Sequence, residues 1–199
     1  MIAETRKQIK IALKLLVVFT FLTGFVYPLV VTGLAQLLFP WQANGSILKV
    51  NDKAIGSRFI GQAFTDPKYF WGRPSATTPF PYNAASSSGS NLGPSNPDFL
   101  SAVQGRVKDL QNANPQAPDA KRIPVDLVTA SGSGLDPEIS PRAAYYQVPR
   151  VAKARAQSEE QIRALVASFI QARTFGILGE PRVNILELNL ALDHLPVHH

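Results

Sequence analysis

The pattern of apolar and polar positions divides the chain at one long apolar run. No charged residue lies between Leu15 and Leu48, and residues 15–39 are apolar at almost every position. A helix needs about 20 apolar residues to cross the hydrocarbon core of a bilayer. The run therefore predicts one transmembrane helix over residues 15–39, long enough to tilt or bend, followed by one soluble domain over residues 42–199.

The soluble part shows helical signals in three places. Apolar residues recur every three or four positions over residues 98–113, which predicts a helix that ends before Pro115. Ser-Pro at residues 140–141 predicts the start of a second helix, with a kink or restart near Pro149. Residues 158–161 read Ser-Glu-Glu-Gln, a capping box, and so predict the start of a third helix.

Other segments have the pattern of strands. Two short apolar runs flank Asn51-Asp52 and predict a hairpin over residues 47–55. Residues 123–129 predict a short strand or extended segment, and the leucines that alternate over residues 186–193 predict a half-buried strand. This mixture indicates an α+β fold for the soluble domain. The aromatic residues expected in its core are Phe59, Phe64, Tyr69, Phe70 and Trp71.

Residues 72–98 are dense in Pro, Gly, Ser and Asn, a composition typical of a flexible linker. Tyr82 and Leu92, however, give the segment something to bury, and Asn and Ser side chains stabilise ordered turns. We therefore predict that residues 82–97 and the loop SGSGLDP at residues 131–137 are ordered and form a docking or structural surface. Its candidate residues are Asn83, Asn91, Asn96, Ser131, Ser133 and Asp136.

Charge at the N-terminus predicts the orientation of the chain in the membrane. Residues 1–14 carry four basic side chains against one acidic one, and positive residues beside a spanning helix stay in the cytoplasm. We expect a cytoplasmic basic tail over residues 1–14 and an extracytoplasmic domain over residues 42–199, in the cell inner membrane. A cleaved signal peptide is the alternative, since Gly33-Leu34-Ala35 fits a small-x-small cleavage site, but the apolar run is longer than usual for one.

Composition narrows the chemistry of the soluble part. After residue 42 there are 16 Lys and Arg against 13 Asp and Glu, a mild excess that gives little support for a nucleic-acid partner. The absence of cysteine excludes disulfides and thiol catalysis. No G-x-S-x-G motif occurs, and the only histidines are His194, His198 and His199 at the C-terminal end, where it is open whether the last two are native. Asp136 and Glu138 flank a proline with no further ligand aimed at them, so we expect no metal site.

Two further patterns bear on binding. The SGSGLDP loop resembles a phosphate-binding loop in its glycines, but Asp136 stands where a phosphate site needs a cation, so we expect an ordered turn instead. Within the apolar run, four small or kinking residues recur at every fourth position, a spacing that lets a second helix approach closely. These helix-packing candidates are Thr20, Gly24, Pro28 and Thr32.

Several sequence blocks carry a family resemblance. GSRFIGQAF, YFWGRPSA, YNAASSSGSNLGPSNP, IPVDLVTASGSGLDPEISPRAA and GEPRVNILELNLAL follow in order behind one N-terminal apolar run. The chain resembles, over nearly all its length, the C chain of the Kdp potassium-transporting P-type ATPase of bacteria and archaea. Glu138 departs from the pattern, because the family more often has histidine there.

The resemblance implies an accessory subunit, without catalytic residues or a cofactor of its own, in a complex that handles ATP and K⁺. The implied partners are a channel-like potassium-binding subunit, a P-type ATPase subunit and a very small membrane subunit, all in the lipid bilayer. It also implies a catalytic chaperone that raises the ATP affinity of the pump subunit, with Gln147 as the matching position for an ATP contact. The charge-based topology conflicts with that contact, since it places Gln147 outside the cell.

The residues agree with a non-catalytic role. The chain lacks the Asp-Lys-Thr-Gly-Thr motif that such a pump phosphorylates, because Asp52-Lys53 is followed by Ala54-Ile55. One helix whose only ionisable residue is Tyr27 cannot enclose an ion path. Argued without the resemblance, the alternative is a membrane-anchored extracytoplasmic ligand-binding module or enzyme.

Overall fold

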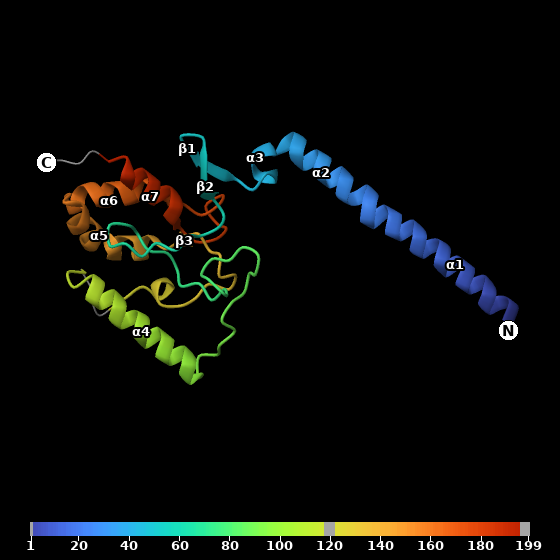
Figure 1. Ribbon diagram of the computed structural model, residues 1–199, viewed down its shortest axis with the longest axis horizontal. Coiled ribbons are helices and arrows are strands. Elements are labelled where there is room, and N and C mark those ends of the chain that lie inside the picture. Colours follow the sequence, from blue (N-terminus) through green and yellow to red (C-terminus); the bar gives the residue numbers. More distant parts are fainter. Residues whose placement is uncertain (1, 118–121, 196–199) are drawn as a thin grey trace. The chain divides into compact units, whose positions relative to one another are not determined.

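A computed structural model of the protein describes residues 2–117 and 122–195 (Figure 1). The chain divides into two compact units, one up to Ile47 and one from Leu48 onward. The first unit is a long helix with a short helical turn behind it, and the second is a mixed helical and sheet unit. This agrees with the predicted α+β class and with a single apolar helix ahead of it. His198 and His199 lie outside the described residues.

The first unit is one continuous helix of 37 residues, Ile2–Leu38, which is long and apolar enough to cross a membrane. It consists of α1 (Ile2–Phe21), a π-helical turn η1 (Leu22–Val26) and α2 (Tyr27–Leu38). The helix therefore includes the basic residues expected to form a separate tail, and no residue of α1 or α2 is buried. The short helix α3 (Pro40–Ala43) follows.

The π turn ends two residues before Pro28. A proline has no backbone N–H, and its ring clashes with the carbonyl four residues earlier, here that of Gly24. The structure accommodates it by widening the turn, so that Tyr27 N–H donates to the carbonyl of Leu22, five residues back. The irregularity expected at Pro28 is thus present as a π turn in an otherwise continuous helix.

The second unit contains two small sheets. Strands β1 (Ile47–Val50) and β2 (Lys53–Ser57) pair as the predicted hairpin. Asn51 and Asp52, with φ of 50° and 60°, form its left-handed turn. Strands β3 (Glu138–Ile139), β5 (Arg182–Asn184) and β4 (Ile170–Gln171) form an antiparallel sheet in the order β3-β5-β4. Ile139 and Ile170 both stand opposite Val183, from either side.

Two helices of this unit begin at the caps predicted for them, Ser140 and Ser158. Helix α4 (Pro97–Ala113) and helix α6 (Glu159–Ser168) confirm their predictions, and the Ser158 capping box is formed. Helix α5 (Pro141–Arg155) begins at Ser140, whose side chain accepts from Ala143 N–H at 3.1 Å. Of the predicted kink or restart at Pro149, the restart does not occur, because α5 runs through Pro149 as one helix.

The strand predicted over residues 186–193 is wrong, because the segment forms helix α7 (Ile185–Asp193). The side chain of Asn184 caps it by accepting from Glu187 N–H at 3.0 Å. The leucines of this segment also fit a helical spacing, and burial against the core favours the helix over the strand. The buried residues of α7 are Ile185, Leu186, Leu188, Asn189 and Leu192.

The extended segment predicted over residues 123–129 is also wrong in its centre. Val125–Leu127 forms the 3₁₀ turn η2, and Leu127 and Val128 are buried at its end. Asp126 accepts a hydrogen bond from Ser140 N–H at 2.7 Å, which ties the turn to the start of α5. The turn directs the Asp126 carboxylate toward the Ser140 N–H, which allows this hydrogen bond to form.

The core lies around α5, which packs against α6 and β5. Figure 1 shows α5 and α6 beside each other. Val148 and Val151 of α5, Ile162 of α6 and Val183 of β5 are fully buried. The aromatic cluster joins this core as predicted, with Phe70 fully buried and Phe64, Tyr69 and Trp71 packed against it. Phe59 is the exception, because 59% of it is exposed.

Candidate functional site

The side chain of Gln147 lies at the centre of a buried polar network. Gln147 is 1% exposed on α5 and faces the segment that contains Trp71. Its Nε2 donates to the carbonyls of Trp71 (3.0 Å) and Ala143 (3.2 Å). Its Oε1 accepts from Trp71 N–H (2.8 Å) and from Arg150 Nη2 (2.7 Å). Both ends of the amide are thus occupied by groups of the protein itself.

Arg150 completes the network one turn later. Its guanidinium lies 4.0 Å from the centre of the Trp71 ring and also donates to the carbonyl of Pro67. Burial lowers the pKa of Arg150 to about 10, and the charge of Asp66 partly offsets that effect. The group therefore remains a cation at neutral pH, held between α5 and the segment of residues 66–71.

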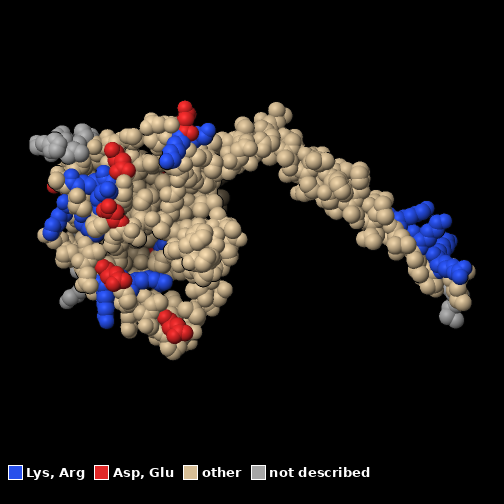
Figure 2. All heavy atoms as spheres, in the orientation of Figure 1, with Lys and Arg blue, Asp and Glu red and all other residues tan. Residues whose placement is uncertain are grey.

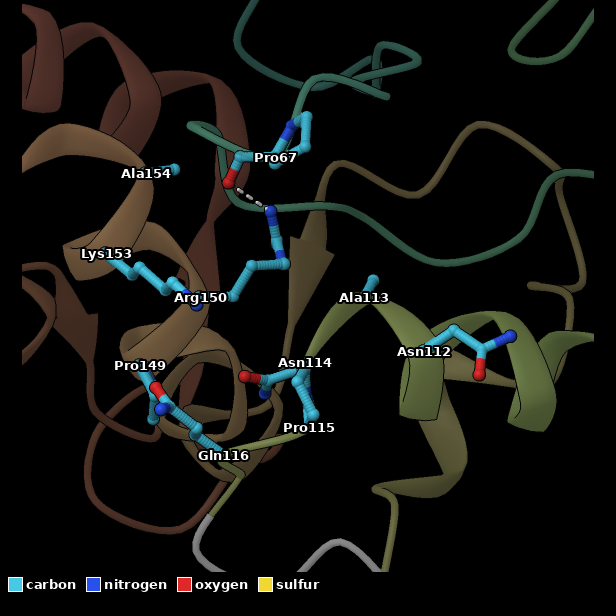
Figure 3. A pocket seen from close by; sticks show the side chains of 10 residues that line it. All are labelled: Pro67, Asn112, Ala113, Asn114, Pro115, Gln116, Pro149, Arg150, Lys153 and Ala154. Atoms are coloured by element: carbon cyan, nitrogen blue, oxygen red, sulfur yellow. Dashed lines mark hydrogen bonds between the residues drawn. The ribbon is translucent and has the colours of Figure 1, made fainter.

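An open pocket of about 420 Å³ lies beside Arg150, between the end of α4 and α5. Figure 3 shows the side chains that line this pocket: Arg150 and Lys153 come from α5, and Asn114 is the residue that follows α4. Asn114 Nδ2 donates to the carbonyl of Tyr146, but its buried Oδ1 has no hydrogen-bond partner among the described residues. The described lining contains two cations and no carboxylate. Such a lining suits water or a small polar group better than a metal ion.

The two segments predicted to be ordered contact each other. Ser88 N–H donates to the carbonyl of Ser133 at 3.0 Å, which joins the 82–97 segment to the SGSGLDP loop. Ser75 Oγ donates to the carbonyl of Gly134 at 2.6 Å. Gly134 has a φ of +68°, and a Cβ there would lie 2.6 Å from the carbonyl oxygen of Ser88. This close approach, together with the positive φ, requires glycine at position 134.

An ion pair closes the SGSGLDP loop. Arg73 Nη1 lies 3.1 Å from Asp136 Oδ2, and Asp136 Oδ1 accepts from Glu138 N–H at 3.0 Å. The loop forms an ordered turn between η2 and β3, as expected, with a carboxylate where a phosphate site would need a cation. Glu138 in turn pairs with Arg182 of β5, with Nε and Oε1 2.9 Å apart.

Tyr82 is the residue that fixes the 82–97 segment to the rest of the unit. Its hydroxyl donates to the carbonyl of Arg73 at 2.6 Å, and its N–H donates to Ser75 Oγ at 2.9 Å. A Cβ at Gly61 would lie 2.3 Å from the Tyr82 ring, so only glycine leaves it room. Burial, and then the negative charge of Asp136, raises the pKa of Tyr82 to about 12. Leu92, also expected to be buried, is 39% exposed.

The six candidate docking residues fall into two groups. Asn83 and Ser131 are buried and act internally, since Asn83 Nδ2 donates to the carbonyl of Thr78 and Ser131 Oγ accepts from Gly134 N–H. Asn96 caps α4 through its side chain, and Asp136 pairs with Arg73. The exposed residues that remain are Asn91 and Ser133. For them a docking role stays a prediction.

The four helix-packing candidates are all exposed on the first unit. Thr20 lies on α1, Gly24 in the π turn, and Pro28 and Thr32 on α2. A Cβ at Gly24 would contact nothing within 4 Å. Packing within the described chain therefore does not explain this face, and its contact with another helix stays a prediction.

Charge is unevenly distributed along the first unit. Figure 2 shows lysine and arginine side chains gathered at its N-terminal end and an uncharged surface beyond them. Within the described residues no three Asp, Glu or His side chains are grouped to hold a metal ion.

Sequence reasoning missed Arg150 and Asn189, which hold the aromatic segment in place, and no spacing pattern singles them out.

Together the fold and the site define a protein with one apolar helix and an α+β unit whose buried Gln147, Asn189 and Asn83 bond backbone groups of the protein itself. The family described as K⁺-transporting ATPase, c chain, matches residues 9–194, and the chain belongs to this family.

Similar proteins carry the same description. The chain is 58% identical over 186 residues to the potassium-transporting ATPase KdpC subunit of Methylococcus capsulatus, covering 94% of this chain and 97% of that protein. It is 59% identical over 181 residues to the KdpC subunit of Polynucleobacter asymbioticus, covering 91% of this chain and 95% of that protein. The KdpC subunit of Polaromonas naphthalenivorans is 59% identical over 184 residues, with 92% and 93% covered.

Proposed function

We propose that this chain is an accessory subunit of an ATP-driven, high-affinity potassium import complex, and that it supports the assembly and stability of the complex. The observation that carries the proposal is the family match over residues 9–194, supported by relatives of nearly equal length that are named as subunits of a potassium-transporting ATPase. Its partners in the membrane are a channel-like potassium-binding subunit, a P-type ATPase subunit and a small membrane subunit.

The arrangement of polar residues supports a role without catalysis. Gln147 and Asn83, both buried, form hydrogen bonds within the protein, and Asp136 pairs with Arg73. A nucleophile with an adjacent base, the arrangement that acyl or phosphoryl transfer needs, is not found among these groups. ATP and K⁺ are therefore handled by the other subunits in this proposal.

We further propose that any effect on the ATP affinity of the pump subunit is indirect. A direct contact through Gln147 would require its amide to leave four hydrogen bonds inside the protein. The orientation inferred from the N-terminal basic residues also places this amide on the side away from cytoplasmic ATP. An effect through assembly of the complex, or through the side on which potassium enters, requires neither the loss of these hydrogen bonds nor a Gln147 amide on the cytoplasmic side.

The test is an affinity pull-down of the full chain from detergent-solubilised membranes of its own host. Recovery of larger membrane proteins with potassium-dependent ATPase activity, together with no ATPase activity of the chain alone, supports the proposal. Recovery of the chain by itself would instead favour a membrane-anchored ligand-binding module or enzyme. The pocket beside Arg150 would then be the first site to probe.

A further inference from the structure

One exposed apolar turn is not explained by the proposed function. It lies between β4 and β5, where Thr174 and Leu178 pair across a short bridge. Phe175 is 89% exposed, Ile177 75% and Leu178 57%, and Phe175 is the most exposed large hydrophobic residue among those described. Isolated apolar residues on a surface are ordinary, but three on one tight turn form a local patch.

Most backbone N–H groups of the turn are bonded locally. Thr174 N–H donates to the carbonyl of Leu178 (2.9 Å), and the N–H groups of Ile177 and Leu178 both donate to the carbonyl of Thr174 (3.2 and 3.0 Å). Gly176 N–H donates to the carbonyl of Arg173 (3.0 Å). Most N–H groups of the turn are therefore already bonded, a requirement for backbone that enters an apolar medium.

The conformation of the turn presents its apolar side chains outward. Phe175 has a φ of +54°, a left-handed conformation that is rare for a bulky residue. At the base, Arg173 Nη2 lies 2.7 Å from both carboxylate oxygens of Glu180, which holds the two ends of the turn together. The result is an apolar tip above a charged base, the polarity that suits the boundary between hydrocarbon and headgroups.

The tether to the membrane limits where this tip can be. Residues 39–46 connect the end of α2 to β1, and part of this segment is the helix α3. Even fully extended, it reaches about 30 Å. A unit of about 150 residues is itself only about 40 Å across. The connection therefore keeps the second unit close to the bilayer that α1 and α2 would cross.

We propose that the turn Thr174–Leu178 inserts Phe175, Ile177 and Leu178 into the interfacial region of that bilayer, as a second membrane contact of the chain. A lipid surface fits better than a protein partner, because three side chains are far fewer than the 20 to 30 residues per side of a stable protein interface. The inference rests on the proposed membrane anchoring by the helix and not on the partners of the complex.

The absence of cysteine makes a direct test possible. The full chain with Ile177→Cys is labelled with an environment-sensitive fluorophore and reconstituted into vesicles of phosphatidylcholine and phosphatidylglycerol. Lipids with a doxyl quencher near the headgroup should reduce its emission at least twofold. The matched control is Val125→Cys, at an apolar residue that is 69% exposed on η2, and its emission should change little.

A second variant tests the same contact from the neighbouring residue. Phe175→Asp in the Ile177→Cys chain should abolish the quenching, because a carboxylate resists transfer into the interface. The far-UV circular dichroism should be unchanged, since Phe175 is almost fully exposed. Phe80→Asp, at a phenylalanine that is 57% exposed, should leave the quenching intact.

The outcomes separate the possible failures. If the chain floats with the vesicles but the Ile177 probe is quenched no more than the Val125 probe, the second contact is wrong and the anchoring stands. If the chain does not float, the anchoring fails and the contact with it. A probe shielded only after the other subunits are added would identify a protein contact and overturn the lipid assignment.

Discussion

At the residue scale, two buried side-chain amides provide the backbone hydrogen bonds that a neighbouring strand would otherwise provide. The segment around Phe70 and Trp71 belongs to no strand, yet its backbone groups are bonded. Gln147 bonds both the N–H and the carbonyl of Trp71, and Asn189 does the same for Phe70, at 2.9 and 3.0 Å. Because buried backbone groups need partners, these amides allow an irregular segment to lie in the core between α5 and α7.

The first prediction concerns Gln147. Gln147→Ala leaves Trp71 N–H and the Arg150 guanidinium without one acceptor each, so it should lower the free energy of unfolding by about 2–4 kcal/mol. The measurement is urea unfolding of the full chain in detergent, followed by tryptophan fluorescence. Gln116→Ala, at an exposed amide, should change it by less than about 0.5 kcal/mol.

The same variant tests the direct nucleotide contact. Calorimetric titration of the wild-type chain with millimolar ATP should show no saturable heat. Saturable binding that Gln147→Ala abolishes, with stability unchanged, would contradict both the structural role of this amide and the inferred topology.

The second prediction concerns Tyr82 and alkaline pH. Its folded-state pKa is about 12 against an ordinary value of 10.0, so the folded protein holds this proton more tightly than the unfolded chain. The resulting stabilisation, about 3 kcal/mol, is complete below pH 10 and is lost as the pH rises through 12. Tyr82→Phe should flatten the dependence of unfolding free energy on pH between 10 and 12.

At neutral pH this variant should also lose about 1 kcal/mol, since the bond from the hydroxyl to the Arg73 carbonyl is gone. Tyr145→Phe serves as the control for removing a phenol elsewhere in the unit. An unaltered slope above pH 10 in Tyr82→Phe would show that the stabilisation does not come from this residue.

At the element scale, the helix of the first unit combines a π turn with an exposed face of small residues. The π turn over Leu22–Val26 contains Gly24 and ends two residues before Pro28, and both residues are members of that face. Wide turns and small residues both expose backbone, and close approach of a second helix would cover it. The face therefore suits a partner helix of the complex.

The third prediction tests this face with Gly24→Leu. The variant helix should form normally, because nothing lies within 4 Å of a Cβ at Gly24. Loss of close packing should cost about 1 kcal/mol, or about a fivefold loss in affinity for the complex, measured by quantitative copurification. Gly33→Leu is the matched control, since Gly33 has equal space and stands about two and a half turns further on. Equal recovery of Gly24→Leu and wild type would place the contact elsewhere.

At the scale of the whole molecule, orientation in the membrane decides which partners the second unit can meet. The four basic residues of the N-terminal end predict that this end stays inside and that the second unit lies outside. The indirect route of any effect on ATP affinity depends on this orientation.

The fourth prediction is therefore a labelling pattern. Ser86 is exposed, so Ser86→Cys should react with a membrane-impermeant thiol reagent in intact spheroplasts. Ala3→Cys, at the other end of the helix, should react only after lysis. The reversed labelling pattern would contradict the inferred topology and would place Gln147 on the cytoplasmic side, where ATP is abundant.

The sequence by itself determined the elements whose signals are local. The apolar run, the caps at Ser140 and Ser158, and the turn at Asn51-Asp52 all act within a few residues, and the structure confirms the elements they predict. The family blocks likewise lie along the chain, and the match over residues 9–194 confirms the resemblance.

Only the tertiary structure decided the elements whose pattern was ambiguous. The leucines after Ile185 satisfy both a strand and a helix period, and burial against α6 and β5 selects the helix. Gln147 and Arg150 became a network only when α5 met a segment some 76 residues earlier in the chain. Contacts of that separation leave no periodic trace in the sequence, because they depend on how the elements pack rather than on how each one forms.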